Sequence, residues 1–238
     1  MSASQGRPDF RKALAQHQDY CDALRECGVK LTVLAADERY PDGTFVEDTA
    51  VIAARVAVMT QPGAPSRAGE VPAIAAALRQ FRPVLEQIEP PGTADGGDIC
   101  QADDHFFIGV SARTNQAGAT QLAAILTRRG YTASMVDIRG HRTLLHLKSG
   151  IAWLGDRRLV MVAGAPRTGE MAAFELIEVD VAEAYAANCV RVNDVVLVAE
   201  GYPKLAARLD GLGYAVRSVD VSEFRKMDGG LSCLSLRF

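Results

Sequence analysis

The sequence predicts one α/β domain over residues 1–238, built from about five repeated units of roughly 40 to 55 residues. A helix-like stretch ends and a β-rich run begins at Gly28, at Gly130 and at Gly213. Glycine is expected just past a helix C-terminus, where it accepts a left-handed conformation. Predicted strands also clearly outnumber predicted helices, which disfavours a plain doubly wound sheet and favours a propeller-like array.

The elements follow from apolar spacing and from β-branched or aromatic enrichment. Four helices are expected, the last three with apolar residues at three- and four-residue spacing: 10–27, 70–81, 115–129 and 204–212. β-rich runs that follow a helix or a break are expected at 29–34, 84–88, 131–137, 175–180 and 214–219. The other strand candidates are 45–52, 56–60, 99–102, 106–111, 144–147, 159–163, 189–192, 195–199 and 232–238.

Composition and charge exclude several classes of protein. With 48% hydrophobic residues the chain can bury a sizeable core, and its net charge of −3 includes no basic stripe for a nucleic acid. The apolar runs are far shorter than the roughly 20 residues that span a bilayer, and the first residues show no signal-peptide pattern. We therefore expect a soluble, cytoplasmic protein without nucleic-acid or membrane partners.

The cysteines indicate reduced thiols. Five of them are widely spaced, without a Cys-x-x-Cys pair: Cys21, Cys27, Cys100, Cys189 and Cys233. An odd number in this pattern favours neither a disulfide framework nor a zinc site.

Cys233 is a candidate nucleophile. It follows Gly229-Gly230 and precedes a short apolar alternation, and glycines let the backbone approach a ligand closely. The alternative is a buried cysteine on a terminal strand, since free cysteine is often buried.

His146 is the most distinctive of the four histidines, because it lies within the apolar stretch of residues 144–147. Taken alone, such a histidine is more often a core residue than a catalyst. Beside a nucleophilic Cys233 it would serve as the acid and base, with Asp95 or Asp98 orienting it.

Carboxylates gather at the predicted strand starts, where each taken singly reads as a solvated turn. They are Asp42, Glu47, Asp48, Asp95 and Asp98. Together they suit a planar cation, since a guanidinium offers five N–H donors that match carboxylate oxygens. Arg67 and Arg113 lie in stiff loops and suit the bidentate capture of a small carboxylate, with surface solvation as the alternative.

Seven ordered motifs resemble those of the dimethylarginine dimethylaminohydrolases over about residues 7–238. They are Phe45-Val46-Glu47-Asp48, Pro62-Gly63-Ala64-Pro65-Ser66-Arg67, Asp95-Gly96-Gly97-Asp98, Arg113-Thr114-Asn115, Leu145-His146-Leu147-Lys148-Ser149, Ala187-Asn188-Cys189 and Asp228-Gly229-Gly230-Leu231-Ser232-Cys233. The resemblance implies the pentein fold, a five-fold pseudosymmetric α/β propeller of ββαβ units. It also implies hydrolysis of Nω-methylated L-arginines to L-citrulline and dimethylamine or methylamine, without metal or organic cofactor.

The family pattern implies a role for each candidate. Cys233 attacks the guanidinium carbon and forms a covalent intermediate, and a cationic neighbour favours its thiolate. His146 protonates the leaving amine and activates water, beside Asp95. The implied substrate contacts are Glu47 and Asp48 for the guanidinium, Arg67 and Arg113 for the α-carboxylate, and Asp42 with the Met227 carbonyl for the α-amino group.

Two departures from the family qualify this reading. The chain begins almost at the first helix, so we expect the first unit to be incomplete at the N-terminus, without the strand and substrate-covering loop of the family. An open strand edge there would favour self-association, with a homodimer as one outcome. Lys148 stands where related arginine deiminases have an aspartate, which disfavours unmethylated arginine. The alternatives are a pentein acting on another guanidine, such as arginine or agmatine, and a noncatalytic arginine-binding pentein.

Overall fold

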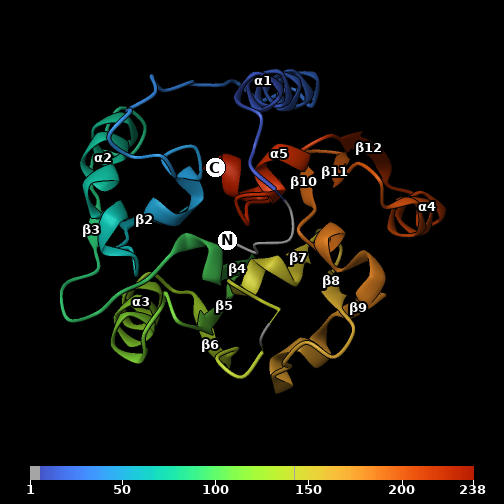
Figure 1. Cartoon of the computed structure of the whole chain (residues 1–238). Helices are drawn as coiled ribbons and strands as arrows, with labels where there is room; N and C mark the ends of the chain where they lie inside the picture. Colours follow the sequence, from blue (N-terminus) through green and yellow to red (C-terminus); the bar gives the residue numbers. More distant parts are fainter. Residues whose placement is uncertain (1–5, 142) are drawn as a thin grey trace.

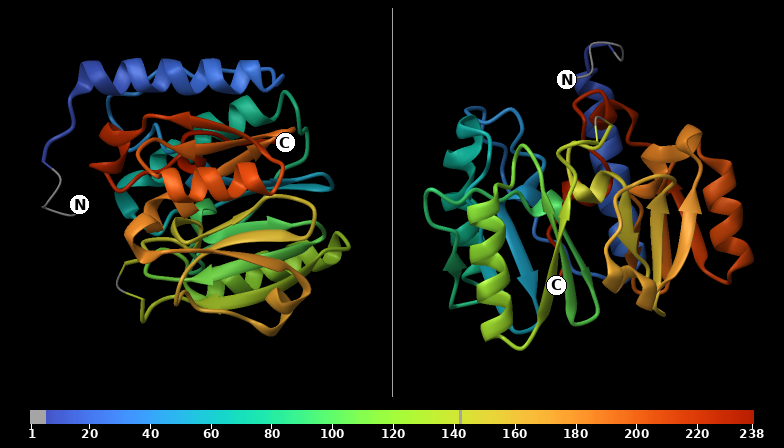
Figure 2. Two further views of the ribbon diagram at one scale, coloured as in Figure 1. Left: turned by 90° about the vertical axis from the view of Figure 1, so that its right-hand side faces the viewer. Right: turned by 90° about the horizontal axis from the view of Figure 1, so that it is seen from below.

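Four three-stranded sheets surround a common centre in the computed structural model of the chain, which describes residues 6–141 and 143–238. Figure 1 shows the sheets and α1 as sectors of a ring, with α2, α3 and α4 on its outside. The two views of Figure 2 show the same helices flanking the sheets. The predicted ring of repeated α/β units is therefore present.

Each sheet repeats one topology, in which the first two strands are antiparallel and the third is parallel to the second. The sheets are β1 (Ala50–Ala53), β2 (Val56–Met59) and β3 (Glu86–Gln87); β4 (Ile99–Ala102), β5 (His105–Val110) and β6 (Thr132–Asp137); β7 (Ile151–Trp153), β8 (Arg158–Val162) and β9 (Glu175–Val179); β10 (Val190–Val192), β11 (Val195–Ala199) and β12 (Ala215–Val219). The parallel third strand requires a crossover, which α2, α3 and α4 supply in three of the units.

The middle strand of each sheet forms the core. In β5, for example, Phe106, Phe107 and Ile108 are at most 1% exposed, with Ile108 paired to Ile99 and to Met135. A strand that is covered on both faces needs an unbroken apolar run, and the sequence supplies one.

The helices begin and end where local chemistry permits. They are α1 (Phe10–Glu26), α2 (Val71–Leu78), α3 (Gln116–Arg128), α4 (Pro203–Gly211) and the short α5 (Ser222–Arg225). The side chains of Asp9 and Asn115 cap α1 and α3 by accepting N–H bonds from their first turns. The predicted helix stops are confirmed, since Gly28, Gly130 and Gly213 have φ of +83°, +78° and +88°.

The fifth sector is built from α1 and the C-terminal segment. α1 packs against α5 and β12, and the Tyr20 hydroxyl lies 2.8 Å from Ser235 Oγ. The predicted strands at 29–34 and 232–238 are wrong, because neither segment pairs with a sheet in the described part of the chain. Residues 32–39 are instead exposed, and Ser232–Leu234 forms a 3₁₀ turn.

Two further strand predictions need correction, and both concern segments that carry candidate site residues. The predicted strand 45–52 begins with a 3₁₀ turn, Val46–Thr49, which the Thr49 hydroxyl closes by donating to the Val46 carbonyl at 2.7 Å. The predicted strand 144–147 pairs with no sheet, because the Leu147 N–H donates to the Asp98 carboxylate at 2.9 Å instead of to a neighbouring strand.

A cavity of about 320 Å³ lies where the sheets meet. Residues of β1, β4, β7 and β10, the first strands of the four sheets, line it together with Ser235, Leu236 and Arg237. Among the described residues, no helix is both long enough and apolar enough to cross a bilayer.

Candidate active site

Cys233 is presented by a tightly built turn. Its side chain is half-buried, and the Gly230 N–H lies 3.4 Å from Sγ. A Cβ on Gly229 would come within 2.1 Å of the Phe45 ring, and one on Gly230 within 2.4 Å of the Asn188 Oδ1 atom. The Gly-Gly pair is therefore required by close approach, and it holds the thiol at the edge of the site rather than in the core.

His146 is held between carboxylates. It is 7% exposed, and its Nε2 atom lies 3.0 Å from Asp95 Oδ2 and 3.9 Å from Asp48 Oδ1. Burial disfavours the charged imidazole, but the nearby carboxylates of Asp48, Asp95 and Asp98 outweigh it and raise the pKa of His146 to about 9. The histidine is therefore protonated at neutral pH and ready to act as an acid.

The two aspartates that were candidates to orient His146 take different places. Asp95 contacts the imidazole directly and also accepts the Gly63 N–H at 2.8 Å. Burial opposes its charge, but the bond from His146 keeps the pKa of Asp95 below its usual value. Asp98 instead accepts the Leu147 N–H at 2.9 Å, and burial raises the pKa of Asp98. Asp95 is thus the direct partner of His146, while Asp98 fixes the backbone behind it.

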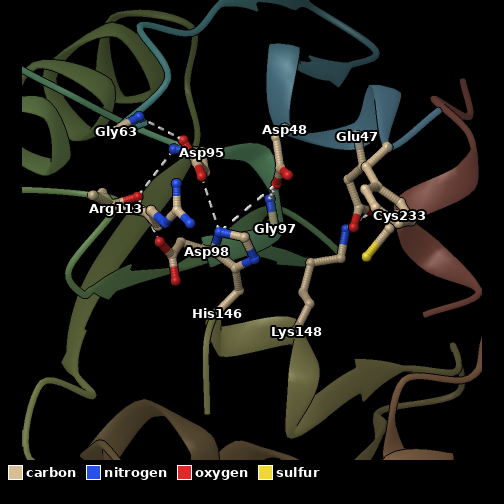
Figure 3. A network of polar contacts seen from close by, with 12 residues as sticks. Glu47, Asp48, Gly63, Asp95, Gly97, Asp98, Arg113, His146, Lys148 and Cys233 are labelled. Atoms are coloured by element: carbon tan, nitrogen blue, oxygen red, sulfur yellow. Dashed lines mark hydrogen bonds and ion pairs between the residues drawn. The ribbon is translucent and has the colours of Figure 1, made fainter. Parts of the chain in front are cut away.

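Glu47 lies beneath Cys233 within a polar cluster. Its carboxylate forms an ion pair with Lys148 and accepts the Ser232 hydroxyl at 2.6 Å, with Arg237 Nη2 at 3.4 Å. Burial disfavours the charge of Glu47, but Lys148 and Arg237 hold its pKa below the usual value. Figure 3 shows Lys148 and Glu47 meeting next to Cys233, across the site from His146.

Asp48 and Arg67 form a buried pair. Arg67 Nη1 bonds Asp48 Oδ2, while Nε and Nη2 bond Glu70 at 2.7–3.1 Å and Nη2 also bonds the carbonyls of Phe45 and Asp42. The guanidinium is nearly inaccessible, with its side chain 7% exposed. Its donors are thus engaged within the protein, and the predicted carboxylate contact of Arg67 would require these bonds to break.

Arg113 has the opposite environment. Its side chain is half-exposed, and within residues 6–141 and 143–238 it forms no hydrogen bond or ion pair. Figure 3 shows it on the His146 side of the site, beside Asp95 and Asp98. Arg113 is thus available to a ligand. Of the two predicted contacts to the α-amino group, Asp42 is exposed and Met227 is half-buried.

The thiol of Cys233 is not activated by its surroundings alone. Burial and the carboxylates of Glu47 and Asp48 raise the pKa of Cys233 to about 12, against a smaller opposite effect of Lys148. The sequence suggested that a cationic neighbour favours the thiolate. The structure corrects this, because the nearby cation, Lys148, is already paired with Glu47. At neutral pH the resting thiol keeps its proton.

Comparison with known proteins identifies the family. Residues 71–188 match the arginine deiminase family. The whole chain, 238 residues, is 46% identical to the N(G),N(G)-dimethylarginine dimethylaminohydrolase of Pseudomonas aeruginosa and covers 92% of it. The chain belongs to the dimethylarginine dimethylaminohydrolase family. A family member from Streptomyces coelicolor is 33% identical over 230 residues, which are 96% of this chain and 87% of that protein.

Solved structures of dimethylarginine dimethylaminohydrolases agree with this assignment. The Pseudomonas aeruginosa enzyme, as a cysteine-to-serine mutant complexed with citrulline, matches with a TM-score of 0.95 and 45% identity over 100% of this chain and 92% of that one. An adduct of a histidine-to-glycine variant with S-methyl-L-thiocitrulline matches equally well, over 93% of its chain. A cyanobacterial arginine dihydrolase at 19% identity and a TM-score of 0.88, covering 97% and 87%, shares the fold. The five-fold pseudosymmetric pentein propeller is thereby confirmed.

One group of side chains could hold a cation. Ligand atoms of Asp48, Asp95 and His146 lie within 4.8 Å of one another. Each already has a partner, because Asp48 pairs with Arg67 and Asp95 with the charged His146. A metal would have to displace these bonds, so the residues present do not fit a resident metal.

Sequence reasoning missed three residues that shape the site. Glu70 neutralises Arg67, and the signal for it is the three-residue spacing of an acid and a base in one turn. Asn188 and Ser232 bond each other beneath Cys233, at 2.9 Å. Both residues lie in motifs that carry the resemblance, but only the fold brings them together.

Proposed function

We propose that the chain hydrolyses Nω,Nω-dimethyl-L-arginine and Nω-methyl-L-arginine to L-citrulline and dimethylamine or methylamine. One observation carries the proposal: a half-buried Cys233 lies across the site from a protonated His146, with buried carboxylates between them. The chain is also 46% identical to a dimethylarginine dimethylaminohydrolase. One solved dimethylarginine dimethylaminohydrolase is complexed with citrulline and another is an adduct with S-methyl-L-thiocitrulline, which fits a cysteine-bound intermediate.

The substrate supplies the missing activation of the thiol. A guanidinium bound beside Asp48 and Glu47 would offset the carboxylates that raise the pKa of Cys233. The thiol then loses its proton to solvent, and the thiolate attacks the guanidinium carbon to form a C–S bond. His146 donates its proton to the departing nitrogen, the C–N bond breaks, and the amine leaves.

The second half of the reaction uses the same histidine as a base. Neutral His146 accepts a proton from water, and the resulting hydroxide adds to the amidino carbon. The C–S bond then breaks, the ureido group of citrulline forms, and the sulfur of Cys233 regains a proton. Asp95, 3.0 Å from the imidazole, stabilises its charged form in both halves.

Arg113 is the residue we assign to the substrate α-carboxylate, because its donors are unengaged in the described chain. Arg67 was assigned there too, and we propose instead that it chiefly holds Asp48 in place. The contacts of Asp42 and of the Met227 carbonyl with the α-amino group stay predictions.

Lys148 supports methylated over unmethylated arginine. It stands at the position where deiminases carry an aspartate, and it pairs with Glu47. No second carboxylate is therefore available there to grip an unsubstituted guanidinium nitrogen.

We also place the enzyme in the cytoplasm, where thiols stay reduced, and the five unpaired cysteines support this. Association into a homodimer stays a prediction.

Citrulline formation from asymmetric dimethylarginine by the purified chain tests the proposal. The wild type and Cys189→Ser, which alters another cysteine in a buried position, should both be active, whereas Cys233→Ser should be inactive. Substrate binding should survive in Cys233→Ser, measured by calorimetry. An inactive wild type, or a Cys233→Ser variant with near wild-type turnover, would refute it.

A further inference from the structure

One residue from each sector of the ring lines the central cavity, which shares Glu47 and Lys148 with the candidate active site. Four of these residues lie two or three residues before the first strand of a sheet, and the fifth lies in the C-terminal segment: Glu47, Gly96, Lys148, Asn188 and Ser232. Glu47, Gly96 and Lys148 occupy equivalent positions, because β1, β4 and β7 begin three residues after them. β10 begins two residues after Asn188, and Ser232 opens the 3₁₀ turn Ser232–Leu234. The pseudosymmetry of the ring therefore brings these residues together around the cavity.

Four of the five residues are joined in a closed circuit of bonds. Lys148 pairs with Glu47, and the Ser232 hydroxyl donates to Glu47 Oε2 at 2.6 Å. The Asn188 amide completes the circuit by donating to the Ser232 hydroxyl at 2.9 Å and to the Lys148 carbonyl at 2.7 Å. The loops that carry Cys233 and His146 are thus connected through one side chain.

Asn188 is the member that uses both atoms of its amide. Besides its two donated bonds, its Oδ1 atom accepts the Ser232 N–H at 2.9 Å. It is 7% exposed, and Gly230 packs so closely that a Cβ there would meet Oδ1 at 2.4 Å. The turn that leads into Cys233 is therefore built against the asparagine amide at Gly230 and Ser232, the residues just before the nucleophile.

We propose that Asn188 is a positioning residue that fixes the Cys233 turn relative to the His146 loop. The proposal rests on the proposed hydrolase function and assigns this role to a residue that contacts neither substrate nor reacting atoms. Two functions are required of the side chain at once, an acceptor for the Ser232 N–H and a donor for two oxygens. An aspartate of the same shape would keep the first and lose the second.

Loss of the Asn188 contacts should affect the chemical step rather than substrate binding. Substrate contacts are assigned to Arg113 and the carboxylates, none of which bonds Asn188 in the described residues. A displaced thiol would still leave these groups in place. Because a shift of about 1 Å can cost about 100-fold in rate, kcat should fall while KM changes little.

The test compares Asn188→Ala and Asn188→Asp with a matched control. Glu183→Ala is suitable, since Glu183 lies five residues before Asn188 and is also 7% exposed. Its carboxylate accepts the N–H groups of Lys204 and Leu205 and, within the described chain, bonds neither the Cys233 turn nor the His146 loop. For each variant, kcat and KM for dimethylarginine are measured on the folded fraction, with the thermal midpoint. Alkylation of Cys233 by iodoacetamide, a small reagent that tolerates misorientation, is the third measurement.

We expect Asn188→Ala to lose about 100-fold in kcat with KM within about threefold, and with alkylation slowed much less than turnover. Asn188→Asp should lose kcat too although it keeps the side-chain shape. Glu183→Ala should lose thermal stability but keep kcat. The proposal is overturned if either Asn188 variant keeps kcat within twofold of the wild type, or if KM alone changes. An inactive wild type would instead remove the proposed function itself.

Discussion

Replacing Arg67 by alanine separates a structural role from a substrate-binding one. The guanidinium is 7% exposed and bonds Asp48, Glu70 and two backbone carbonyls. Removing it would leave two buried carboxylates without their cation. Breaking a buried pair in this way costs about 3–5 kcal/mol, which corresponds to a fall of about 6–20 °C in the thermal midpoint for a domain of this size.

Arg113→Ala is the matched comparison, because Arg113 is half-exposed and unpaired in the described chain. Its loss should change stability by less than about 0.5 kcal/mol and should raise KM about tenfold or more by removing a charge-assisted bond to the substrate. Calorimetric unfolding and citrulline kinetics measure both effects. If Arg67→Ala unfolds at the wild-type temperature and only its KM rises, then Arg67 is a carboxylate ligand and the argument from its burial is wrong.

Three further predictions follow from the same contacts. In Gly97→Ala, the new Cβ would lie 2.8 Å from Asp48 Oδ1 and from His146 Nδ1. We therefore expect a loss of about 1–3 kcal/mol in stability together with a lower kcat. Wild-type stability and kcat in this variant would contradict the prediction. The folded-state pKa of His146, about 9, exceeds its unfolded value of about 6.5, so the stability that protonated His146 contributes is complete below pH 6.5 and is lost as pH rises through 9. The thermal midpoint should therefore fall more between pH 6.5 and pH 9 in the wild type than in His146→Gln. Parallel curves of thermal midpoint against pH would exclude a protonated histidine. In Lys148→Met, Glu47 keeps Arg237 but loses its ion pair with Lys148, so the pKa of Cys233 should rise and alkylation at fixed pH should slow. Unchanged alkylation would refute the coupling.

The sequence was sufficient for most of the fold, because the relevant signals are local. The left-handed glycines Gly28, Gly130 and Gly213 each follow the end of a helix, and a strand begins shortly after Gly130 and Gly213. The apolar runs mark strands that are covered on both faces. Local signals failed at 144–147, where an apolar run forms no strand because the Leu147 N–H bonds a side chain from another unit. Such a partner, 49 residues away, leaves no trace in the local pattern.

In the candidate site, too, local signals identified some residues, while contacts between distant parts of the chain could not be predicted. Residue type and turn context singled out Cys233 and His146 and left Asp95 and Asp98 open as the partner of the histidine. The family resemblance implied Asp95, which does meet His146, at 3.0 Å. The environments of Arg67 and Arg113 could not be distinguished, since both lie in similar loops and only the fold surrounds one of them with carboxylates. The raised pKa of Cys233 was missed for a related reason, as it depends on how the nearby charges are already paired.

The central claim, that Cys233 carries the covalent intermediate, is tested most directly by mass spectrometry of His146→Gly during incubation with asymmetric dimethylarginine. Without the imidazole the departing amine receives no proton from His146 and water activation fails, so an adduct should form slowly and then persist on the peptide that contains Cys233, while citrulline release stops. The wild type should show free citrulline and little adduct at the same time point. Sustained citrulline release by His146→Gly, with an unmodified Cys233 peptide throughout, would contradict the account.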